Sequence, residues 1–142
     1  MNKEHKQLLL QDLCARVIYG VKVTTTNRAV ELAILTGVSI KGKISVETKD
    51  ADIVFECTEV KPYLRSMSSM TEEEKREYVS FIGGQEPYDF DYSAYPIEYK
   101  YIYEWDVTNY VNWLNSHHFD YRGLIPLGLA IEVTEKNNPY KD

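Results

Sequence analysis

Residues 61–74 have the sequence KPYLRSMSSMTEEE, which separates a strand-rich part of the chain from a helix-rich part. Pro62 fixes its own φ angle and favours an extended conformation in the residue before it. Ser69 and Thr71 are each followed three residues later by a glutamate, the spacing of a helix-capping box. We therefore expect the chain to change direction here and a helix to begin near Glu72. Residues 61–74 are called the hinge below.

The part of the chain before the hinge predicts one helix followed by several strands. Residues 1–16 carry an apolar stripe of leucines and a cysteine at helical spacing, and we expect Asp12 on the solvent side. Residues 21–60 contain four or five short β-branched segments separated by turn residues, among them Lys41-Gly42-Lys43. This pattern is typical of an antiparallel meander sheet, with a small barrel as the main variant.

The part of the chain after the hinge predicts two more helices and an apolar segment. Apolar residues at i, i+3, i+4 and i+7 give the second of these helices the strongest helical signal in the chain. The expected ranges are a helix at 72–82, an acidic and aromatic loop with a strand at 85–105, a helix at 106–117, an apolar segment or strand at 124–133 and a frayed tail at 134–142. The fold class is thus α+β in one domain, with an N-terminal helix, four to six antiparallel strands and two helices packed on the sheet.

The charge of the chain makes nucleic acid an unfavourable partner. The 142 residues carry a net charge of −6, and residues 85–106 alone carry −5. An acidic protein repels phosphate at long range. Residues 1–46 are basic, at +4, so nucleic-acid binding through basic side chains there stays open as a weaker alternative. Those side chains are Lys22, Arg28, Lys41 and Lys43.

The sequence predicts a cytoplasmic protein without a membrane segment. No apolar run approaches the ~18 residues of a membrane span, and the N-terminus lacks the apolar core of a signal peptide. Cys14 and Cys57 lie among apolar neighbours, and we expect both to be buried and reduced.

The turn after the last helix holds the densest cluster of reactive side chains. The cluster consists of His117, His118, Asp120, Tyr121 and Arg122. Adjacent histidines on a helix point about 100° apart, and no metal-binding, cofactor-binding or catalytic motif supports them, so we predict no metal, cofactor or catalytic residue. The bland interpretation is a helix end with a local Asp120–Arg122 pair. The alternative is an enzyme or small-ligand site that combines this turn with Arg65.

The acidic and aromatic segment is the main candidate for partner contact. Tyrosines are amphipathic anchors that are enriched at interfaces, and Tyr88, Asp89, Asp91 and Tyr92 lie close together here. The alternative is that these rings lie over the sheet and close the core. With no catalytic motif in the chain, we predict a non-catalytic protein-binding or adaptor protein that uses this segment and the turn.

Three stretches resemble a group of small uncharacterised proteins encoded by gut anaerobic bacteria and by their phages and mobile elements. The stretches are LQDLCAR at residues 10–16, the hinge with its two preceding residues, and WLNSHHFDYRGLIPLGLA at residues 113–130. They cover about a quarter to a third of the chain. The resemblance implies an intracellular accessory protein related to phage proteins, and it implies no activity and no catalytic residue.

Overall fold

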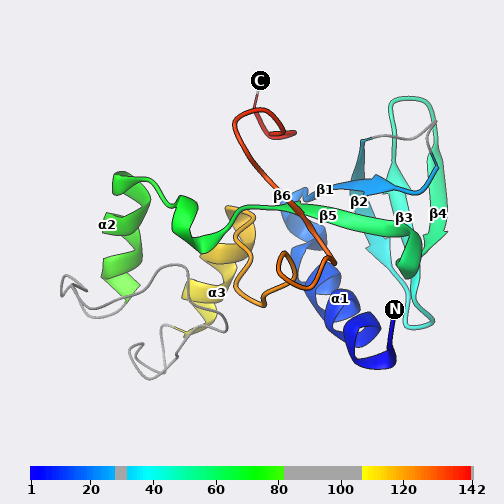
Figure 1. The fold of residues 1–142 in the computed structure, drawn as a ribbon, viewed down its shortest axis with the longest axis horizontal. Helices are drawn as coiled ribbons and strands as arrows, with labels where there is room; N and C mark the ends of the chain where they lie inside the picture. The colour runs from blue at the N-terminus through cyan, green and yellow to red at the C-terminus, as the bar shows by residue number, and fades with distance from the viewer. Residues whose placement is uncertain (28–31, 82–106, 142) are drawn as a thin grey trace.

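The computed structural model describes residues 1–27, 32–81 and 107–141, and these residues form an α+β fold (Figure 1). The predicted α+β class, with an N-terminal helix and two further helices, is confirmed. In chain order the elements are α1 (Lys3–Arg16), the 3₁₀ helix η1 (Val17–Tyr19), β1 (Lys22–Thr25), β2 (Ala33–Val38), β3 (Lys43–Glu47), β4 (Asp52–Glu56), η2 (Cys57–Glu59), β5 (Val60–Leu64), η3 (Met67–Ser69), α2 (Glu72–Phe81), α3 (Val107–Ser116) and β6 (Ile131–Glu132).

The described strands form one open sheet in the order β4-β3-β2-β1-β5-β6. All neighbouring pairs are antiparallel except β5 and β6, which run parallel. The sheet is therefore mixed and does not close, so neither a purely antiparallel meander nor a barrel describes it. The segment 124–133, for which a strand was one of the two expectations, contains the two-residue β6, and its parallel pairing with β5 is what departs from an antiparallel meander.

The first apolar core lies between α1 and one face of the sheet. Alternate residues of β3 and β4 point inward, and Ile44 stands opposite Phe55 in the register of this pair. Leu9 and Leu13 of α1 are fully buried against this face. The other face of these strands is open to solvent, as is common for antiparallel sheets with a helix on one side.

The helices α2 and α3 pack around the hinge and not over the sheet. They form a second apolar cluster with the hinge and the turn after α3, in which Tyr78 meets Tyr110 edge-on at 5.3 Å between ring centroids. Figure 1 shows α2 and α3 on the opposite side of α1 from β2, β3 and β4. The expectation that both helices cover the sheet is thus corrected, because the hinge residues Met67 and Met70 supply an apolar surface of their own.

The start of α2 follows from the hinge sequence. The Thr71 amide donates to the Glu74 carboxylate at 2.9 Å, and the Glu74 amide donates to the Thr71 hydroxyl at 3.1 Å. This reciprocal pair satisfies two amides that the first turn of a helix leaves without partners. The Ser69 hydroxyl donates instead to the Ser66 carbonyl within η3, so Thr71 is the residue that caps α2.

The C-terminal tail is anchored and not frayed as the sequence suggested. The register of β1 and β5 pairs Val23 with Pro62, and extending it by one residue places Lys22 opposite Tyr63. The Tyr140 hydroxyl lies between these two residues, where it accepts from the Lys22 amide at 2.9 Å and donates to the Tyr63 carbonyl at 2.8 Å. One side chain from the tail therefore bridges two strands where their own ladder opens.

Candidate functional site

The structure brings the hinge and the turn after α3 together. The Arg65 amide donates to the His118 carbonyl and the Asp120 amide donates to the Arg65 carbonyl, both at 2.8 Å. These bonds form a short parallel bridge between residue 65 and residue 119. The ligand-site alternative required these two segments to be adjacent, and they are. Whether they form a site depends on whether their side chains are accessible to a ligand or are bonded within the fold.

Arg65 is held by groups within the hinge and the turn. Its Nη1 and Nη2 atoms each donate to one oxygen of Glu74 at 2.7 Å, and its guanidinium lies 4.2 Å from the centroid of the Phe119 ring. Burial would raise the pKa of Glu74, but the hydrogen bonds from Arg65 and Thr71 outweigh it and lower this pKa to about 2. Arg65 therefore joins α2 to the turn and does not project toward a ligand.

Asp120 binds the backbone that follows it. Its two carboxylate oxygens accept from the amides of Leu124 and Ile125, both at 2.9 Å, and its side chain is fully buried. Burial raises the pKa of Asp120, and the two amides oppose that rise. The expected local pair between Asp120 and Arg122 is not formed, because the carboxylate is already bonded on both oxygens.

Arg122 binds a carboxylate from the other end of the chain. Asp12 of α1 accepts from Arg122 Nη1 at 3.0 Å and from Arg16 Nε at 2.8 Å. Arg16 also donates from Nη2 to the Phe119 carbonyl at 2.6 Å. Asp12 and Arg16 are both 0% exposed, which corrects the expectation that Asp12 faces solvent. The ring of Tyr121 lies between the two guanidinium groups, 5.3 Å from that of Arg16 and 4.6 Å from that of Arg122.

His118 adopts a left-handed backbone conformation with φ of 64° and stacks on the tail. Its ring lies 3.9 Å from that of Tyr140, with an angle of 10° between the planes. Burial lowers the pKa of His118, and the charges of Arg16 and Arg65 lower it further, to about 4. Its Nδ1 atom is buried and, within the part of the chain that the structure describes, has no hydrogen-bond partner.

The predicted site residues of the turn are therefore internal supports. Tyr121 donates its hydroxyl to Asn115 at 2.9 Å, and His117 Nδ1 lies 3.0 Å from the Trp113 carbonyl, so all five turn residues and Arg65 have partners or packing inside the fold. Across the described ranges, no group of three or more histidine, cysteine, aspartate or glutamate side chains is placed to hold a metal ion. Tyr88, Asp89, Asp91 and Tyr92 lie outside the described residues.

Two of the four basic residues considered for nucleic acid, Lys22 and Lys43, already have partners within the protein. Lys22 donates from Nζ to the Pro139 carbonyl at 2.6 Å, and Lys43 forms an ion pair with Glu56. Lys41 is exposed in the loop after β2, and Arg28 lies outside the described residues. Two of these four side chains are thus already engaged within the protein.

The exposed side of α1 was missed by the sequence reasoning. After Lys6, the exposed residues of α1 and η1 are Gln7, Gln11, Cys14 and Ile18, none of which carries a charge. The two charged residues in this stretch of the helix, Asp12 and Arg16, point inward. A surface of about three turns without charge is unusual, because exposed helix faces are normally rich in charged side chains.

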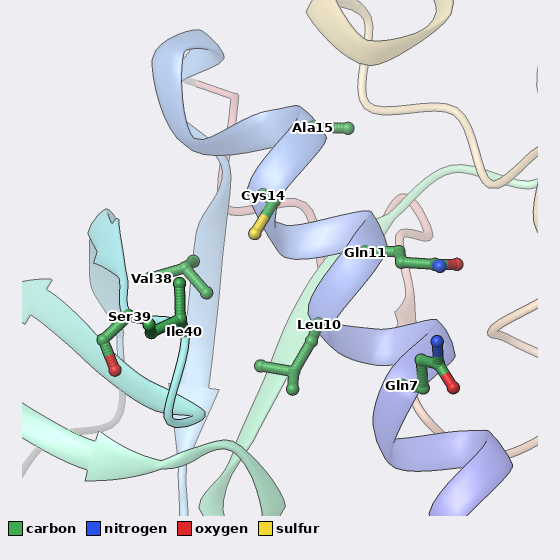
Figure 2. Close-up of a pocket in the computed structure, with 8 residues that line it drawn as sticks. All are labelled: Gln7, Leu10, Gln11, Cys14, Ala15, Val38, Ser39 and Ile40. Atoms are coloured by element: carbon green, nitrogen blue, oxygen red, sulfur yellow. The ribbon is translucent and has the colours of Figure 1, made fainter.

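An open groove of about 510 Å³ lies beside this face, between α1 and the loop that joins β2 to β3. Figure 2 shows Leu10 and Cys14 extending from α1 toward Val38 and Ile40. Cys14 is exposed and is therefore not the buried thiol that its apolar neighbours suggested, whereas Cys57 is buried as expected. Ile40 is 103% exposed at the rim. One signal in the sequence could have indicated this face. Asp12 and Arg16 are the only charged residues between Lys6 and Tyr19, and their spacing of four allows them to pair with each other.

Comparisons with protein-family models, curated proteins and solved structures find no match to this chain. Among the described residues, no helix is long and apolar enough to cross a membrane.

Proposed function

We propose that this chain is a non-catalytic accessory protein of the cytoplasm that binds another protein through the outer face of α1 and the adjoining groove. The observation that carries this proposal is the uncharged exposed face of α1 and η1 after Lys6, formed by Gln7, Gln11, Cys14 and Ile18. The centres of protein interfaces are depleted of charged side chains and are surrounded by polar residues. An exposed isoleucine at the groove rim, Ile40, adds an apolar group that a partner would cover.

The state of the turn supports binding over catalysis. A general acid, general base or nucleophile has to reach its substrate, but Asp120 is fully buried and bonded to two amides. His118 is stacked on Tyr140, and Arg122 is bound to Asp12. These side chains hold α1, the hinge and the tail together, and the accessible surface of α1 is left for contact with a partner.

The test is co-purification from the cells that naturally make the protein, with two matched variants. Ile40→Asp places a charge at the groove rim, and Val54→Asp places the same charge on the open face of the sheet, where Val54 is 61% exposed. We expect the wild type and Val54→Asp to retain the same partner and Ile40→Asp to lose it. Equal retention by both variants, or equal loss, would overturn the proposal.

A further inference from the structure

The residues that are exposed after Lys6 in α1 and η1 have the spacing of a helix-packing seam. Gln7, Gln11, Cys14 and Ile18 are separated by four, three and four residues. Side chains at such intervals form one row along a helix, and a second helix packs its own row against it. The row extends over about 17 Å, the length of three helical turns.

Depressions lie on both sides of this row. The groove of about 510 Å³ is lined by Leu10, Val38 and Ile40. A second open depression, of about 450 Å³, lies on the other side of the helix and is lined by Leu8 and Leu127 together with Glu4 and His5. Both also include Gln7 and Gln11, which form the ridge between them. A polar ridge between two hollows that both have apolar side chains in their walls suits a partner helix whose apolar side chains enter the hollows, while the glutamine amides bond to its polar groups.

The charged residues at one end of the row favour a partner whose contacting residues carry the opposite charge. Lys3, Lys6 and Lys41 are exposed at the N-terminal end of α1 and in the neighbouring loop, beside the exposed Glu4, while the nearby Glu56 is paired with Lys43. The Lys6 side chain reaches the loop, because its Cε lies 3.6 Å from where a Cβ of Gly42 would be. The rest of the chain is acidic enough to give a net charge of −6, so this basic end is a local exception.

From these three features we infer that the outer face of α1 binds an amphipathic helix of a partner protein, with apolar residues at intervals of three and four and acidic residues over Lys3, Lys6 and Lys41. This inference rests on the proposed function and adds the chemical class of the partner. The apolar residues fill the hollows beside Gln7 and Gln11, and the acidic residues give orientation and speed of association.

The experiment uses the full chain and two synthetic helical peptides of about 18 residues with a fluorescent label. One carries leucines at intervals of three and four with glutamates at the flanking positions, and the other has lysines in place of the glutamates. Binding is measured by fluorescence anisotropy at low and high salt. We expect the acidic peptide to bind at least about tenfold more tightly than the basic one, with a difference that shrinks at high salt.

Variants assign the contact to the surface. We expect Lys6→Glu to lower the affinity for the acidic peptide about fivefold and Ile40→Asp to lower it about tenfold or more. Val54→Asp should leave this affinity unchanged. Equal binding of the two peptides, or indifference to Ile40→Asp, would overturn the assignment of a helical acidic partner. If the acidic peptide fails to bind but co-purification of the cellular partner still depends on Ile40, only the partner class is wrong. If co-purification is also insensitive to Ile40→Asp, the proposed function itself fails.

Discussion

Arg16 and Asp12 form an ion pair at 2.8 Å, one helical turn apart, inside the protein where neither side chain is exposed. This pair turns both charges of the second half of α1 toward the turn after α3 and leaves the outer surface of that half without charge. Arg122 completes the pair from a position 110 residues away along the chain. The same three residues therefore determine how α1 is oriented and what its exposed face presents to a partner.

Replacing Asp12 tests whether this buried cluster stabilises the fold. We expect Asp12→Ala to lower the free energy of unfolding by about 3–5 kcal/mol, because Arg16 is left as an uncompensated buried charge and Arg122 loses its partner. Urea denaturation followed by circular dichroism measures the change. The neighbouring Gln11→Ala, on the exposed side of the same turn, should cost less than about 0.5 kcal/mol. A loss below about 1 kcal/mol for Asp12→Ala would contradict the burial of the pair.

Replacing Glu74 tests the connection between the hinge and α2. Glu74→Gln should destabilise the protein by about 1–3 kcal/mol near neutral pH, because it weakens the paired bonds to Arg65 and the cap at Thr71. The pKa of Glu74 is lowered to about 2 in the folded state, so this stability is present above pH 4.5 and is lost as the pH falls through 2. The free energies of unfolding of the wild type and the variant should therefore converge as the pH falls to 2 and below. Glu73→Gln, at an exposed neighbouring position, serves as the control. Its free energy of unfolding should stay close to that of the wild type at both neutral and acid pH.

His118 should make the protein less stable in mild acid. Its pKa is about 4 when folded and 6.5 when free, so the unfolded chain binds more protons between these values and stability falls as the pH drops from 6.5 to 4. We expect this group to contribute about 2–3 kcal/mol to that fall. His118→Asn tolerates the left-handed backbone and removes the proton-binding group, so the slope of stability against pH should flatten. Tyr140→Phe keeps the stacked ring and should keep the wild-type slope. An unchanged slope in His118→Asn would show that the imidazole is not buried in this way.

The Tyr140 hydroxyl should stabilise the junction of β1 and β5. Tyr140→Phe removes the group between the Lys22 amide and the Tyr63 carbonyl, and we expect a cost of about 1–3 kcal/mol because both backbone groups lose their partner. Hydrogen exchange at the Lys22 amide should become faster, and the free energy of opening derived from its rate should fall by the same amount. Lys136→Ala, in the exposed part of the same tail, should leave both measurements within about 0.5 kcal/mol and 3-fold of wild type.

The two thiols should react at very different rates. Cys14 is exposed beside the groove, and Cys57 is buried with a pKa raised by its burial. Titration with an aromatic disulfide reagent should therefore modify Cys14 in the native protein and Cys57 only after denaturation. Cys14→Ser should abolish the native reaction and leave the denatured one. Rapid modification of Cys57 in the folded state would contradict its position in the core.

The sequence was most informative where structure depends on neighbouring residues. The capping box of Thr71 and Glu74 placed the start of α2 because both partners lie within one turn. The apolar spacing from Val107 to Leu114 likewise indicated α3, because one face of a helix can be read from its own residues. The α+β class followed from such local patterns, without any knowledge of how the elements pack.

The sequence was misleading where the partner lies far along the chain. An aspartate and an arginine four residues apart are typical of an exposed helical ion pair, and only the distant Arg122 and the Phe119 carbonyl explain their burial. The turn after α3 looked reactive for the same reason, since histidine, aspartate and arginine serve equally well as structural supports. Tyr140 was missed because its polar surroundings in the tail resemble those of a disordered terminus.

The position of Tyr140 has a consequence for synthesis. Its hydroxyl joins strands that are both complete by residue 64, yet it is translated 118 residues after Lys22. While the ribosome adds the intervening residues, the Lys22 amide and the Tyr63 carbonyl lack this hydrogen-bond partner. The bridge between Lys22 and Tyr63 can therefore form only after residue 140 has left the ribosome, long after both strands have been made.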